Sequence, residues 1–166
     1  MLPESVIVCN DDMFCMKPQR GKMPSFHRGR LADQLARLRS DAPLSRYTAM
    51  LNNVQRALDH EGIAGAYEYE THVPMPMTKT GILKALEVRA KWPGVNLSKR
   101  TLYGNVNAVG GRVLPGPIPG QMDVKVRHAD GATPTGAWLS TTEQSFAERF
   151  YATLADAFPE PSRYER

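Results

Sequence analysis

Two neighbouring segments with a helical spacing of apolar residues constrain this chain most. In residues 28–39, leucines recur at intervals of four and three, so they fall on one side of a helix. Residues 45–60 repeat this pattern, and Gly62 is well placed to end that helix. The apolar stripes contain Leu31, Leu35 and Leu38 in the first segment and Met50, Leu51, Val54 and Leu58 in the second. Both segments are predicted as helices with one buried side.

Other segments favour short strands and further helices. Runs rich in Val, Ile, Tyr and Thr predict strands at 5–9, 66–73, 112–114, 123–128 and 137–140. Helices are predicted from about residue 78 to 91, over 97–109, and from 142 onward. The sequence therefore predicts a single α+β domain over residues 1–166, with about five helices and a small mixed or antiparallel sheet. Its expected irregular parts are a flexible basic loop at 10–30 and a loose tail at 159–166.

The composition excludes several classes of protein. A chain of 166 residues with 42% hydrophobic and 23% charged residues is ordinary for one globular domain. The chain has no run of 18 apolar residues, so we expect no membrane span, and its first residues lack the pattern of a secretory signal. Cys9 and Cys15 are too few for a disulfide framework, which predicts reduced thiols and a cytoplasmic protein.

The basic residues are concentrated in two blocks. Lys17–Arg39 contains seven Lys or Arg and one acid, and Lys79–Arg112 contains the same numbers, so each block has a net charge of +6. This distribution indicates a polyanionic partner such as nucleic acid, and the alternative is a solvated basic surface without a partner. An inhibitor that mimics DNA would be acidic, which these blocks argue against.

The second basic block has the layout of a DNA-reading element. Residues 79–109 are predicted as two helices separated by a Trp-Pro-Gly break. The Ser-Lys-Arg-Thr-Leu-Tyr run at 98–103 resembles the recognition helix of helix-turn-helix regulators, a resemblance that covers about twenty residues. It implies that Lys99, Arg100 and Tyr103 face outward toward a DNA groove. Helix-turn-helix proteins commonly pair, so a homo-oligomer is compatible with this hypothesis.

Further residues are assigned to phosphate contacts. Ser98 is placed to cap its helix and bond a phosphate. In the basic loop 17–30, the basic residues are interleaved with Phe26 and His27, as suits phosphate contacts and base stacking. A flexible solvated loop is the simpler interpretation. A β-hairpin after residue 111 would form a wing with Arg112 at its base. The predicted nucleic-acid-binding residues are Lys17, Arg20, Lys22, Arg28, Ser98, Lys99, Arg100, Tyr103 and Arg112.

An alternative hypothesis is a small enzyme. In a strand, Glu68, Glu70 and His72 would share one face, where two carboxylates and an imidazole suit acid–base chemistry. Such a site would take a nucleoside-like or cationic small molecule, with a subunit interface as one arrangement. The simpler interpretation is a solvent-facing polar side of a half-buried strand. No metal-binding or cofactor motif is present, so neither a metal nor a cofactor is expected.

Overall fold

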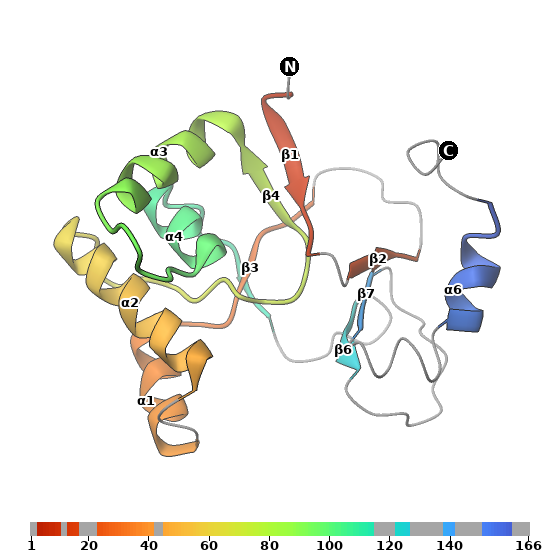
Figure 1. Ribbon diagram of the computed structural model, residues 1–166, viewed down its shortest axis with the longest axis horizontal. Helices are drawn as coiled ribbons and strands as arrows, with labels where there is room; N and C mark the ends of the chain where they lie inside the picture. Colours follow the sequence, from red (N-terminus) through yellow and green to blue (C-terminus); the bar gives the residue numbers. More distant parts are fainter. Residues whose placement is uncertain are drawn as a thin grey trace. The chain divides into compact units, whose positions relative to one another are not determined.

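The computed structural model describes residues 3–10, 13–16, 23–41, 45–114, 122–126, 138–141 and 151–160 (Figure 1). The chain divides into two compact units, each described by itself below. Unit 1 comprises Met1–Cys9 and Lys22–Pro115, and unit 2 comprises Asn10–Gly21 and Gly116–Arg166. Both units contain helix and small sheets, so the predicted α+β class is confirmed.

Among its described residues, unit 1 contains four helices and two two-stranded sheets. The helices are α1 (Leu31–Asp41), α2 (Arg46–His60), α3 (Lys79–Ala90) and α4 (Lys99–Val106). The strands are β1 (Ser5–Val8), β3 (Phe26–His27), β4 (Met75–Thr78) and β5 (Arg112–Val113). β1 pairs antiparallel with β4, placing Val6 opposite Met77, and β3 pairs parallel with β5. All four helices and β4 contribute buried side chains to one core.

Unit 2 contains one sheet and one helix among its described residues. These elements are β2 (Met13–Cys15), β6 (Met122–Val126), β7 (Trp138–Thr141) and α6 (Tyr151–Ala157). The strand order is β2-β7-β6, with β7 antiparallel to β2 and parallel to β6. Leu139 and Leu154 are buried together, and Phe14 and Met16 pack against them. Within the described helices of the chain, none has both the length and the apolar composition that crossing a bilayer requires.

The two helices predicted from leucine spacing are confirmed. α1 starts later than predicted because Gly29 has a φ of 101° and the chain before it is extended as β3. α2 starts next to Ser45, whose hydroxyl accepts a hydrogen bond of 3.0 Å from the backbone N–H of Thr48. The apolar stripes of both helices face the core, with Leu38 and Met50 partly buried and the other stripe residues fully buried, and α1 packs against α2.

The strand predicted at 66–73 is wrong. In this segment only Tyr67 forms a β-bridge, an isolated one with Arg30. Glu68 and Tyr69 are both buried although they are neighbours, so the side chains do not alternate between core and solvent. His72 has a φ of 45°, in the left-handed region, which interrupts any extended course.

Polar side chains of α4 replace the missing strand partner. The amide of Asn105 accepts from the Tyr67 backbone N–H at 2.8 Å and donates to the Tyr67 carbonyl at 2.8 Å. The hydroxyl of Thr101 accepts from the Tyr69 backbone N–H at 3.1 Å. Since buried backbone groups must be paired, these side chains allow an irregular segment to cross the core. Alternation in the sequence cannot reveal such a partner.

The predicted hairpin after residue 111 is also wrong. The hairpin would have joined β5 to β6. Instead β5 pairs with β3 and β6 pairs with β7, and the two belong to different sheets. The predicted loop at 10–30 contains β2 and β3, while its residues 17–22 lie outside the described part of the chain. Of the helix predicted from 142, the structure describes α6, and 142–150 lie outside the described residues.

Gly104 lets α4 lie directly against an aromatic ring. A Cβ at this position would fall 2.4 Å from Cε2 and 2.5 Å from Cδ2 of Tyr69. Separations below 3.0 Å do not occur at real Cβ atoms, so either the ring or the helix would have to shift. The glycine that weakens the helical pattern in sequence is therefore required by packing.

We expect Gly104→Ala to lower the free energy of unfolding by about 1–3 kcal/mol, because it overpacks the core against Tyr69. Helix propensity alone predicts the opposite sign, a gain of up to about 1 kcal/mol. Urea unfolding followed by circular dichroism measures the change. Ala36→Gly, at an exposed position of α1, serves as the control for propensity without packing. A more stable Gly104→Ala protein would contradict the close contact.

Candidate functional site

α4 is buried, unlike a recognition helix. Ser98, Arg100 and Tyr103 have exposed fractions of 0%, 4% and 5%, so the prediction that Arg100 and Tyr103 face outward is wrong. Of the predicted contact residues on this helix, only Lys99 is exposed. α3 and α4 do pack together, but every residue from Arg100 to Gly104 is buried. A helix in this position cannot enter a DNA groove.

The buried polar side chains of α4 bond neighbouring backbone groups. The guanidinium of Arg100 donates to the carbonyl of Val73 and, at 3.4 Å, to the carbonyl of Val8. The Tyr103 hydroxyl accepts from the Thr78 backbone N–H at 2.9 Å, where β4 passes into α3. These contacts explain why an arginine and a tyrosine are buried. They also remove both side chains from the candidate interface.

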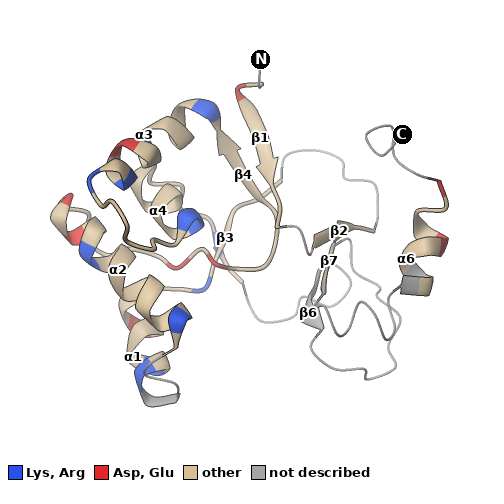
Figure 2. Ribbon diagram, viewed as in Figure 1, with Lys and Arg blue, Asp and Glu red and all other residues tan. Residues whose placement is uncertain are grey.

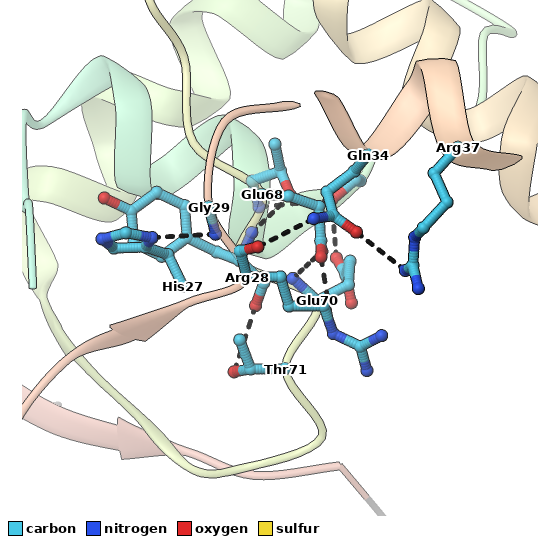
Figure 3. Close-up of polar contacts among 11 residues, drawn as sticks. His27, Arg28, Gly29, Gln34, Arg37, Glu68, Glu70 and Thr71 are labelled. Carbon is cyan, nitrogen blue, oxygen red and sulfur yellow. Dashed lines mark hydrogen bonds and ion pairs between the residues drawn. The ribbon is translucent and has the colours of Figure 1, made fainter. Parts of the chain in front are cut away.

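Glu68 is a buried carboxylate next to one cation. Its exposed fraction is 1%, and its Oε2 lies 3.5 Å from Nε of Arg28. Its Oε1 accepts from the backbone N–H of Glu70 (Figure 3). The Tyr47 hydroxyl lies beside the same carboxylate. Burial raises the pKa of Glu68, and the charge of Arg28 opposes that shift. Burial, followed by the charge of Glu68, raises the pKa of Tyr47 as well.

Glu70 has a different environment. It is half-buried, and its Oε1 accepts a hydrogen bond of 2.6 Å from the Ser98 hydroxyl. The Ser98 oxygen also accepts from the backbone N–H of Thr101, at 3.2 Å, and so caps α4 as predicted. A carboxylate therefore lies beside the first turn of this helix, where the helix dipole favours negative charge.

The predicted acid–base face does not form as a strand face. Glu68 is buried, Glu70 is half-buried, and His72 follows in a left-handed conformation. Glu68 is only 1% exposed, so a substrate in solution cannot reach its carboxylate in this conformation. The catalytic hypothesis for Glu68, Glu70 and His72 is not otherwise tested and stays a prediction. The described residues contain no group of three or more His, Cys, Asp and Glu side chains able to hold a metal ion.

Gln34 links the cluster of Arg28, Glu68 and Tyr47 to α1. Its Nε2 donates to the Arg28 carbonyl at 2.8 Å, and its Oε1 accepts from Nη2 of Arg37 at 2.9 Å (Figure 3). Arg30 precedes the same helix and lies with its guanidinium 4.3 Å from the centre of the Tyr67 ring. Helical spacing puts positions 30, 34 and 37 on one side of α1, a pattern already visible in the sequence.

Four exposed cations stand around this cluster. Arg30 and Arg37 belong to the side of α1 just described, Arg46 neighbours Tyr47 at the start of α2, and Lys99 neighbours Ser98 at the start of α4. We call these four residues the basic face. Figure 2 shows basic segments before α1 and at the beginnings of α2 and α4. The contacts of Glu68 with Arg28 and Tyr47, and of Glu70 with Ser98, bring these segments together.

Positive charge dominates the described surface of unit 1. The exposed cations are Arg30, Arg37, Arg39, Arg46, Arg56, Lys79, Lys84, Lys91, Lys99 and Arg112. The exposed acids are Glu4, Asp33, Asp59 and Glu87. The exposed cations outnumber the exposed acids by ten to four, so the described surface of unit 1 carries a net positive charge.

The structure describes only some of the other residues that were predicted to contact phosphates. Lys17, Arg20 and Lys22 lie outside the described residues. Arg112 is exposed on β5, and Arg28 is half-buried in its ion pair with Glu68.

Comparison with known protein families, characterised proteins and solved structures finds no match to the chain. The interpretation of the site therefore depends on its own residues.

We expect Arg28→Ala to lower the free energy of unfolding by about 1–3 kcal/mol, because it leaves the Glu68 carboxylate buried without its cation. A double-mutant cycle with Glu68→Gln, followed by urea unfolding, isolates this pair. The double variant should be more stable than the sum of the two single losses implies. Simple additivity would show that the two side chains do not interact.

The pKa of Glu68 gives a second expectation. Because burial raises this pKa, the folded protein holds the Glu68 proton more tightly than the unfolded chain does. The stability that the protonated Glu68 side chain contributes is fully present below the pKa of Glu68 in the unfolded chain. It is lost as the pH rises through the pKa of Glu68 in the folded protein. Glu68→Gln cannot titrate, so the wild type should lose stability relative to this variant over the pH range that begins at about 4.3, the pKa of an unperturbed glutamate. Urea unfolding over this range measures the difference, which a constant value would contradict.

Proposed function

We propose that the protein binds nucleic acid through its phosphates, using the basic face of Arg30, Arg37, Arg46 and Lys99. The observation that carries this proposal is the convergence of exposed cations at the starts of two capped helices. The first turn of α2 adds the partial positive charge of its helix dipole beside Arg46, whereas the carboxylate of Glu70 already occupies the first turn of α4. Phosphate groups are the ligands that such a combination attracts.

The burial of α4 determines the mode of binding. Reading a DNA sequence requires side chains that reach base edges, and Arg100 and Tyr103 are occupied in the core. Contacts to phosphates need only exposed cations at suitable spacing, and they carry little sequence information. We therefore propose binding with little sequence preference.

We expect Arg46→Ala/Lys99→Ala to weaken binding to a labelled random-sequence duplex, measured by fluorescence anisotropy at about 50 and 200 mM salt. Losing two phosphate contacts should also lower the slope of log affinity against log salt by about 2. Wild-type affinity should fall steeply with salt and vary little among unrelated duplex sequences.

The matched control is Arg56→Ala/Lys79→Ala, which removes the same charge at exposed positions outside the basic face. It should retain most of the affinity and most of the salt dependence. Equal losses of duplex affinity in both double variants would show that only the net charge matters. That result would reject the basic face as the binding site. A wild-type protein that binds no duplex at low salt would reject the proposed function.

A further inference from the structure

α3 carries apolar side chains on two opposite sides. Gly81, Ala85 and Val88 are buried in the core of unit 1. On the other side, Leu83 and Leu86 are 52% and 54% exposed. A surface helix of a monomer normally has a single apolar stripe, so a helix that is apolar on both sides indicates a second partner.

Two opposite charges flank the exposed leucines. At 3.6 residues per turn, Lys84 and Glu87 lie along the same flank of the stripe that contains Leu83 and Leu86. Lys84 and Glu87 are both exposed, and neither forms an ion pair with another residue that the structure describes. This arrangement of one cation and one acid beside an apolar stripe is self-complementary.

The self-complementarity has a definite geometry. When a two-fold axis relates two antiparallel helices, each flank meets the same flank of its partner, running in the opposite direction. Crossing near residues 85 and 86 places Lys84 of one copy opposite Glu87 of the other, and the reverse pair forms by symmetry. The leucines of both copies then meet at the centre. The antiparallel orientation also places opposite ends of the helix dipoles together.

We infer that a second copy of this chain docks on the outer side of α3 and forms an antiparallel two-fold dimer. This inference is independent of the proposed nucleic-acid binding. The paired area is that of one 12-residue helix, which is small for a stable interface. The dimer is therefore weak, with a dissociation constant on the order of micromolar.

Sedimentation velocity of the full chain over about 1–200 µM tests the dimer in the concentration range of that affinity. The wild type should change from monomer to dimer, whereas Leu83→Ser/Leu86→Ser should stay monomeric with an unchanged circular dichroism spectrum. Val113→Ser is the control, since it removes an exposed apolar side chain elsewhere in unit 1. It should dimerise as the wild type does.

Charge reversal tests the register. Lys84→Glu alone and Glu87→Lys alone should each weaken the dimer roughly tenfold, because each places like charges opposite across both symmetric contacts. The double variant Lys84→Glu/Glu87→Lys should restore wild-type affinity. A dimer in which the double reversal fails to restore affinity would overturn the antiparallel arrangement.

A wild type that is monomeric at all concentrations would overturn the dimer itself. If Leu83→Ser/Leu86→Ser then also lowers the free energy of unfolding, another segment of the same chain covers α3. If that free energy is unchanged, a different protein is the remaining occupant.

Discussion

The amide of Asn105 supports the organisation of unit 1, because it pairs both backbone groups of Tyr67 in a segment that belongs to no sheet. Thr101 pairs the backbone N–H of Tyr69, so an irregular stretch passes through the core with these buried backbone groups satisfied. Glu68 and Glu70 owe their positions to this stretch. The placement of α1 and of the starts of α2 and α4 around them depends on the same contacts.

Helix formation was the most predictable part of the fold. Leucine spacing identified α1 and α2, and Ser98 was identified as the cap of α4. The failures at 66–73 and after residue 111 have one physical cause, because pairing in those regions depends on residues far away in sequence. Alternating Tyr and Glu residues are compatible with an edge strand. They are equally compatible with an irregular segment whose backbone is hydrogen-bonded by side chains of α4, and the local sequence pattern does not distinguish these two structures.

The candidate site was predictable in its chemistry but not in its membership. A surplus of positive charge was evident from composition, and the Arg30, Gln34 and Arg37 side of α1 was visible from helical spacing. Arg100 and Tyr103 were misplaced because cations and phenols are usually exposed, whereas here they satisfy buried backbone groups. Tyr47 was recognised only as an apolar residue, and its contact with Glu68 required the tertiary structure.

The division of the chain into two units is not a division of the sequence into two halves. Residues Asn10–Gly21 belong to unit 2, although unit 1 both precedes and follows them. β2, from this early stretch, pairs with β7, which is synthesised more than a hundred residues later. During synthesis, β2 therefore stays without its partner while the whole of unit 1 is made, and unit 2 can be completed only after unit 1. Any cut made between them at a single point leaves one unit incomplete.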